Sequence, residues 1–291
     1  MSTMLAFPAR ASLVVEGRFN GSGMIISGGR IEGTFVQWID PRGTRTETTL
    51  RQWDINHETT IDSKHTVITR RDRGLTWVLD GSDSSYTEQT LADARDIAEM
   101  LEIADTTCRA WQPIPEHPDT VAGFEALHFR YRDRTAGAKL NVAIPTVTDL
   151  WVARGVPAAP MLATTSTWLI NAPGMYASGA RARGLGLPAD AITLRITRSI
   201  DLLDTPEGAQ LLSSADRDST AQSTSSIGAI DFELGTLSLG GTEVTSIREA
   251  ELPHGALDLP RGFARKADQD AELLKYWRST RTQSRRPTAS R

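Results

Sequence analysis

The sequence predicts an α+β protein that is built mainly from antiparallel β-strands. Short runs rich in β-branched residues, closed by turns containing glycine or proline, recur along most of the 291 residues. In contrast, only one segment, 91–104, places its apolar residues at a strong helical spacing. Apolar residues make up 39% of the chain and charged residues 23%, which is enough apolar material for a packed core.

The first eighty residues are predicted to form strands joined by tight turns. The segment Asp40-Pro41-Arg42-Gly43 is typical of a turn, because proline fixes φ at the second position. The threonine-rich run after it suits a sheet with one dry face and one wet face. The expected strands are Ala11–Gly17, Gly23–Ser27, Ile31–Ile39 and Thr44–Asp54.

Residues 66–80 form the clearest local unit, a predicted β-hairpin. Two β-rich runs flank Asp72-Arg73-Gly74, where the glycine can adopt a positive φ. After this turn, Leu75, Trp77 and Leu79 share one face of the strand, because side chains alternate along it. We expect that face to point inward.

One amphipathic helix is predicted after the hairpin. The segment Ser85-Tyr-Thr-Glu88 matches a capping box, in which the two polar side chains bind free backbone N–H groups at the start of a helix. Apolar residues then recur at helical spacing and form a single stripe. The stripe consists of Leu91, Ala94, Ile97, Ala98, Leu101 and Ala104.

The second half of the chain alternates between strands and irregular segments. Residues 155–190 are rich in glycine, alanine and proline, which predicts a loop with one or two short helices that covers another part of the fold. Residues 205–226 are predicted to be an exposed insertion. The expected strands are Phe124–Arg132, Leu140–Ile144, Asp149–Ala153, Ala191–Leu202, Ile227–Leu239 and Thr242–Glu251.

Charge and composition exclude several classes of function. The formal net charge of −4 argues against a protein that coats a nucleic-acid backbone. Residues 278–291 hold five arginines and no acid, so the rest of the chain carries −9, and a solubilising terminus is the favoured interpretation. The only cysteine, Cys108, allows no intrachain disulfide. No apolar run approaches the ~20 residues of a spanning helix, and the first residues do not form a secretory signal as they stand.

The common catalytic patterns are absent from the sequence. It contains no Gly-x-Ser-x-Gly elbow, no phosphate-binding loop ending in Gly-Lys-Ser/Thr and no His-Glu-x-x-His helix. The best candidates for metal ligands are Asp54, His57, Glu58, Asp62 and His65, a donor set that suits zinc or iron. Their spacing matches no ligand template, so a solvated hairpin tip is favoured, and neither a metal nor a cofactor is expected.

Tryptophans lie on or beside many of the predicted strands. For each one, core packing is the favoured interpretation. Together they predict more, because a curved sheet with more large apolar side chains than one helix can cover would leave a concave apolar cavity. The five residues concerned are Trp38, Trp53, Trp77, Trp151 and Trp168.

A set of motifs follows a recognisable order along residues 12–266. The first are Gly33-Thr-Phe-Val-Gln-Trp-Ile-Asp40, Thr44-Arg-Thr-Glu47, the hairpin 69–80 and Tyr86-Thr-Glu88. The later ones are Thr120-Val-Ala-Gly-Phe-Glu-Ala126, Leu150-Trp-Val-Ala153, Gly186-Leu-Pro188, Glu243–Pro253 and Leu259-Pro-Arg-Gly-Phe263. In this order they resemble the LolA-like lipoprotein carriers and, more closely, bacterial cell-envelope proteins that share their architecture.

This resemblance implies one half-barrel domain over residues 12–266, with helices covering the concave face of a strongly curved antiparallel sheet. Residues 267–291 would then form a short helix and a basic disordered tail. The resemblance also implies a periplasmic or cell-envelope location and an apolar hollow that receives acyl chains, with no catalytic residues. The residues expected to line the hollow are Leu75, Trp77, Leu79, Ile97, Leu101, Trp151, Leu194 and Ile196.

The predicted function is therefore non-enzymatic binding or carriage of an apolar ligand, such as a lipid or a lipoprotein acyl chain. Two alternatives stay open. The fold could act as an envelope sensor that holds a protein partner through an edge strand or through the segment 155–190, or it could be a metal-dependent enzyme that uses the cluster from Asp54 to His65. Neither a nucleic-acid partner nor a transmembrane segment is expected.

Overall fold

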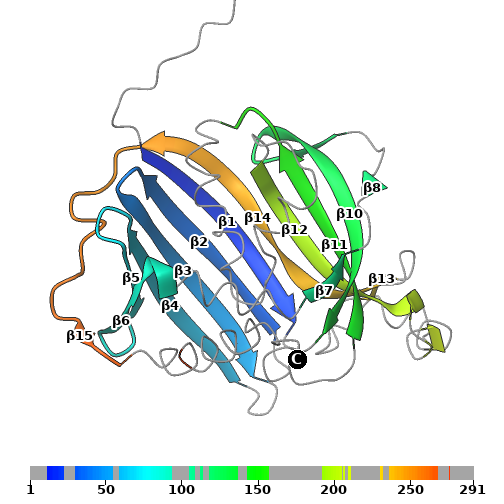
Figure 1. Cartoon of the computed structure of the whole chain (residues 1–291), viewed down its shortest axis with the longest axis horizontal. Coiled ribbons are helices and arrows are strands. Elements are labelled where there is room, and N and C mark those ends of the chain that lie inside the picture. Colours follow the sequence, from blue (N-terminus) through cyan, green and yellow to red (C-terminus); the bar gives the residue numbers. More distant parts are fainter. Residues whose placement is uncertain are drawn as a thin grey trace, which may run out of the picture.

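The protein forms a single open β-sheet, seen in a computed structural model (Figure 1). The structure describes residues 12–22, 30–54, 59–93, 105–108, 112–113, 118–136, 143–156, 192–204, 206, 209–210, 230–231, 236–267 and 275. Fifteen strands belong to the sheet, with β15-β6-β5-β4-β3-β2-β1-β14-β12-β11-β10-β7 as the main order. Neighbouring strands are antiparallel except β15 and β6, which are parallel. No described helix is long and apolar enough to cross a membrane.

The first six strands form an antiparallel meander, in which each strand pairs with the next along the chain. Tight turns join β2 to β3, β4 to β5 and β5 to β6, and the turn after Arg70 ends at Gly74, whose φ of 66° is accessible to glycine without strain. The strands are β1 (Ser12–Ser22), β2 (Arg30–Asp40), β3 (Gly43–Asp54), β4 (Thr59–Arg70), β5 (Leu75–Asp80) and β6 (Ser85–Thr90).

The remaining strands extend the sheet on the other side of β1. Three of them, β10 (Phe124–Ala136), β11 (Ala143–Ala153) and β12 (Ile192–Asp201), pair in sequence order, and β14 (Thr236–Ala250) lies between β12 and β1. The chain thus joins its first strand to its last long strand at the middle of the sheet (Figure 1). The short strands are β7 (Asp105–Cys108), β8 (Gln112–Pro113), β9 (Asp119–Val121), β13 (Ile230–Asp231) and β15 (Ala264–Arg265).

The two faces of β1–β4 differ in chemistry, because side chains alternate along each strand. We call the side that carries Val15, Phe19, Phe35 and Leu50 the apolar face, and the side that carries Arg18, Thr34, Thr49 and Lys64 the polar face. The large side chains of the apolar face are buried in a core cluster that also includes Leu194 and Val244. The described members of this cluster lie on the strands, except Val156, which lies three residues after the end of β11: Leu13, Val15, Phe19, Ile31, Phe35, Ile39, Leu50, Val121, Ala126, Trp151, Ala153, Val156, Ile192, Leu194 and Val244.

Two phenylalanines on the apolar face lie against glycines of the neighbouring strand. Gly17 is opposite Phe35, and Phe19 is opposite Gly33. A Cβ at Gly17 would lie 2.2 Å from Cζ of Phe35, and one at Gly33 would lie 2.4 Å from Cζ of Phe19. Each ring therefore occupies the space that the missing side chain leaves, which packs β1 closely against β2.

The C-terminal segment, residues 251–267, covers one end of the polar face. Leu252, Leu257, Leu259 and Phe263 pack there against a second core cluster, made by Ile68, Trp77 and Leu79 with Leu75 and Tyr86. Polar contacts hold the segment in place, because the Arg70 guanidinium donates to the carbonyl oxygen of Leu257 at 3.1 Å and to the Asp258 carboxylate at 3.0 Å. The inward orientation expected for this face of the hairpin agrees with the burial of Trp77 and Leu79.

The α+β architecture with helices over a concave face is wrong. The described residues are almost entirely β-strand, with one 3-10 turn at Leu202–Asp204, and no described helix covers either face of the sheet. One reason is that the strands are longer than expected: β11 replaces two predicted strands, and β14 continues through Gly240-Gly241. At Gly240, φ is 123° and a Cβ would lie 2.2 Å from the Asn20 carbonyl oxygen, so glycine lets the strand bulge there instead of ending it.

The capping box predicted at Ser85-Tyr-Thr-Glu88 is also wrong. These residues belong to β6, and Glu88 accepts a 2.9 Å hydrogen bond from Nε1 of Trp77 on the neighbouring strand. A box forms five residues later, where the Asp93 backbone N–H donates to Oγ1 of Thr90 at 3.0 Å and the Thr90 N–H donates to the Asp93 carboxylate at 3.3 Å. The rest of the predicted helix, 94–104, lies outside the described residues, as do almost all of 155–190, 205–226 and 268–291.

The strands predicted at Ile31–Ile39 and Thr44–Asp54 and the hairpin around Gly74 are confirmed. The strand expected at Gly23–Ser27 lies outside the described residues. The domain boundaries stay a prediction.

Candidate functional site

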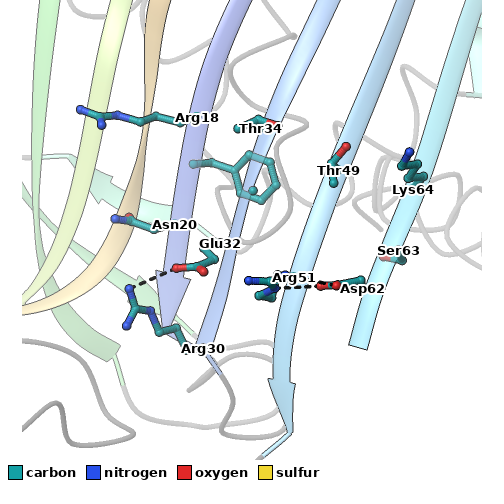
Figure 2. A pocket seen from close by; sticks show the side chains of 12 residues that line it. Arg18, Asn20, Arg30, Glu32, Thr34, Thr49, Arg51, Asp62, Ser63 and Lys64 are labelled. Carbon is teal, nitrogen blue, oxygen red and sulfur yellow. Dashed lines mark hydrogen bonds and ion pairs between the residues drawn. The ribbon is translucent and has the colours of Figure 1, made fainter. Parts of the chain in front are cut away.

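A groove of about 750 Å³ lies over β1–β4, at the end of the polar face that the C-terminal segment leaves open (Figure 2). Its walls carry long charged side chains, and its floor carries short ones. The lining residues are Arg18, Phe19, Asn20, Arg30, Glu32, Gly33, Thr34, Thr49, Arg51, Asp62, Ser63 and Lys64.

Strand register explains why this surface is hollow. Arg18 is opposite Thr34, Thr34 is opposite Thr49, and Thr49 is opposite Lys64, so the four side chains form one row across the sheet. The two threonines are much shorter than the arginine and lysine at the ends of the row. Figure 2 accordingly shows Thr34 and Thr49 between Arg18 and Lys64.

A second row lies beside the first and contains most of the ion pairs. In it, Glu32 is opposite Arg51, and Arg51 is opposite Asp62. Two nitrogens of the Arg51 guanidinium donate to the two oxygens of Asp62 at 2.9 and 3.2 Å, which is the forked geometry of an arginine–carboxylate pair. Arg30 donates to Glu32 at 3.2 Å (Figure 2).

The charges of the groove are partly compensated. The hydrogen bond from Arg51 lowers the pKa of the exposed Asp62 carboxyl, so this carboxylate is ionised at neutral pH. Arg18 donates to Oε2 of Glu243, on the neighbouring β14, at 2.9 Å. Lys64 makes no ion pair with any residue that the structure describes. The lining therefore has four cationic side chains against two carboxylates.

A ring stack continues the first row of side chains beyond β14, on the side away from the groove. The imidazole of His128 stacks on Trp151 with the ring centroids 4.2 Å apart, and the Arg195 guanidinium lies 4.3 Å from the Trp151 centroid. Nε1 of Trp151 donates to Asp119 at 2.7 Å. Both neighbours contact Trp151 through its ring, which is buried, so the arrangement stabilises the packing of β10, β11 and β12.

Asp149 links this ring stack to a further arginine. Its carboxylate accepts hydrogen bonds from Nε2 of His128 at 2.7 Å and from Nε of Arg130 at 2.8 Å. The Asp149 side chain is only 9% exposed, and buried carboxylates need such donors. Within the part of the chain that the structure describes, no serine or cysteine hydrogen-bonds to this histidine, and the arrangement is that of a packed polar network.

The residues predicted to line an apolar hollow are placed in different parts of the fold. Leu75, Trp77 and Leu79 lie on β5 beneath the C-terminal segment, whereas Trp151, Leu194 and Ile196 lie on β11 and β12. Register places Ile196 opposite Thr242, which is itself opposite Phe19 of the apolar face. Ile97 and Leu101 lie outside the described residues. Whether these residues bind a ligand stays a prediction.

The candidate metal ligands are separated by the sheet. Side chains alternate along β4, so His65 shares a face with Ser63, and Asp62 shares a face with Lys64. His65 and Asp62 therefore point to opposite faces of the sheet. Asp54 pairs with Thr59 in the backbone register, as expected for the end of a hairpin, and His57 and Glu58 lie outside the described residues. Within the described ranges, no three such side chains come close enough together to hold a metal ion.

Of the groove residues, the sequence singles out only Asp62 as a candidate site residue, and then as a metal ligand. Each strand of the groove carries a pair of polar residues two positions apart, such as Arg18 with Asn20 and Asp62 with Lys64. The pattern is visible, but it indicates only a wet face. The groove side chains come together only through the register of four strands. The lengths of the connections set that register, and the polar pattern of a single strand does not reveal it.

Comparison with known proteins gives only a distant likeness. No protein-family model matches the chain, and no curated protein matches it. Among solved structures, the fold is similar to that of "a putative lipoprotein" from Parabacteroides distasonis, with 7% sequence identity and a TM-score of 0.25. The match covers 82% of this chain and 95% of that one. A likeness this low supports no argument about function, and the resemblance to LolA-like carriers stays a prediction.

Proposed function

We propose that the protein is a non-enzymatic binding protein that holds an apolar ligand, a lipid or an acyl chain, against the apolar face of its sheet. The observation that carries this proposal is the cluster of large apolar side chains on this face of β1–β3. Phe19, Phe35 and Leu50 belong to it, and the rings of the two phenylalanines fill the places of Gly33 and Gly17. The ordered motifs that resemble LolA-like carriers support the same function.

The physical reason is that the apolar face of a sheet must be covered by another layer. Phe19, Phe35 and Leu50 are only 4%, 6% and 9% exposed, so the ligand would bind within the core that they form and not on an open surface. An acyl chain gains about 0.8 kcal/mol for each methylene that it buries, so such a core needs no specific polar contacts to hold it.

The direct test is mass spectrometry of an organic extract of the purified protein. We expect a lipid or fatty acid in molar proportion to protein, and a fluorescent fatty acid that competes with it. If the extract holds no lipid and the fluorescent fatty acid does not bind to the delipidated protein, the proposal is wrong.

Two neighbouring substitutions distinguish the faces. Leu50→Ala on the apolar face should weaken fatty-acid binding roughly tenfold, because the ligand loses apolar contact area. Thr49→Ala, one residue earlier on the polar face, should leave that affinity unchanged. Circular dichroism of both variants verifies that each is folded, and equal affinity of the two variants would contradict the assignment of the ligand to the apolar face.

A further inference from the structure

We propose that the groove over β1–β4 is a second binding site, on the opposite face of the sheet, for the phosphate group of an anionic ligand. The proposal does not depend on the one above, because the two sites use different faces and different chemistry.

The groove has an excess of hydrogen-bond donors. Guanidinium and ammonium groups only donate, and a threonine hydroxyl can donate as well. In the row Arg18–Thr34–Thr49–Lys64, every member offers a donor, and none is a carboxylate. A phosphate group provides strong acceptor oxygens for several such donors at once.

Positive charge remains in the groove after its internal ion pairs have formed. Arg18 uses Nε and Nη2 on a single oxygen of Glu243, so its other nitrogen can still donate. Lys64 forms no ion pair within the described ranges and is exposed. These two cations flank the short threonines, so an anion seated over Thr34 and Thr49 lies between two positive charges (Figure 2).

The charge of the groove contrasts with that of the protein as a whole. The whole chain has a formal net charge of −4, yet four of the twelve lining residues are cationic and two are acidic. Glu32 and Asp62 at one end of the groove would repel a long polyanion that follows the strands. The site therefore fits a small phosphate-bearing molecule or a single lipid headgroup and not a nucleic-acid backbone.

The test measures binding of two probes at low ionic strength, where exposed charges are least screened. Isothermal titration calorimetry with glycerol phosphate tests a free small molecule. Co-sedimentation with phosphatidylcholine vesicles, with and without phosphatidic acid, tests a lipid headgroup. Binding of either probe that depends on the groove supports the proposal and identifies the source of the phosphate, whereas binding of neither overturns it.

Variants with opposite expected signs sharpen the test. Lys64→Gln should weaken phosphate binding roughly tenfold, as expected for the loss of one charge-assisted hydrogen bond. Glu32→Gln should strengthen it, because a nearby negative charge is removed. Arg248→Gln is the control: this arginine is exposed like Lys64, but it is ion-paired to Glu16 and lies outside the groove.

An equal effect of Lys64→Gln and Arg248→Gln would mean that the anion responds to overall charge and would overturn the site. An unchanged affinity in Glu32→Gln together with an unchanged affinity in Lys64→Gln would do the same. Thermal unfolding of each variant verifies the fold, and all three substitutions are at exposed or half-buried positions.

Discussion

The two ends of the polar face are built on the same strands but meet different surroundings. On β4, Ile68 and Arg70 are buried beneath the C-terminal segment, whereas Asp62 and Lys64, four to eight residues away, are exposed in the groove. Both pairs occupy alternate positions of one strand, so backbone geometry does not distinguish them. The difference lies in the side chains.

Desolvation explains why the segment covers one end and leaves the other open. Leu252, Leu257 and Phe263 gain free energy by burying Trp77 and Leu79. The same residues placed over Arg51 and Asp62 would remove charged groups from water, which costs more than the apolar contact returns. A few side chains thus decide whether one end of the polar face is buried as core or stays exposed as a binding surface.

The largest effect is expected from Trp77→Ala at the covered end. The indole is 6% exposed and its Nε1 donates to Glu88, so removing it leaves a large cavity and an acceptor without its donor. The free energy of unfolding should fall by about 3–5 kcal/mol. Urea denaturation measures this, with Thr49→Ala at the open end expected to change it by no more than about 0.5 kcal/mol. Similar losses in both variants would show that the two ends do not differ.

A smaller loss is expected from Gly33→Ala, where the groove floor meets the apolar face. The added Cβ would lie 2.2 Å from the Thr49 carbonyl oxygen, and backbone cannot move aside as a flexible side chain can. Overpacking of this kind costs about 1–3 kcal/mol. Gly21→Ala on β1 is the control, because its Cβ would meet nothing nearer than 3.6 Å. Denaturation midpoints of the two variants that coincide would contradict the tight packing at Gly33.

The smallest effect concerns the pH dependence of the turn beside the covered end. Hydrogen bonds from Arg70 lower the pKa of Asp72 to about 2. Because the folded-state pKa is below that of the unfolded chain, near 3.8, the pair stabilises the fold above that value and stops doing so as the pH falls towards 2. In Asp72→Asn, the unfolding midpoint should therefore fall less steeply between pH 5 and pH 2 than in the wild type, as measured by thermal melts. Parallel curves would rule out this role of Asp72.

Local patterns in the sequence predict some of the fold and fail where pairing decides. The alternation of Ile31–Ile39 and the turn at Gly74 specify β2 and the β4–β5 hairpin without reference to the rest of the chain. The motif at Ser85 has the composition of a helix start, yet it forms a strand that pairs with β5. Trp77 on β5 donates a hydrogen bond to Glu88 on that strand. That contact joins residues eleven positions apart, so a local motif cannot reveal it.

The candidate site was less predictable still. Arg18 and Lys64 become members of one row only through the registers of β1, β2, β3 and β4. The residues predicted to bind a ligand are apolar instead, because a large apolar side chain indicates burial at the level of a single residue. A shared row of charged residues has no such local signal.

The pairing of β1 with β14 also has a consequence for synthesis of the chain. Leu13 is registered with Glu249, so one edge of β1 stays open until more than two hundred further residues have been made. At ordinary elongation rates, that interval is roughly 10–50 s. During it, β1–β6 can form their hairpins, but β1 presents an unprotected edge to other chains. The middle of the finished sheet is therefore among the last parts to assemble, and it is a stretch at which nascent chains are exposed to mispairing.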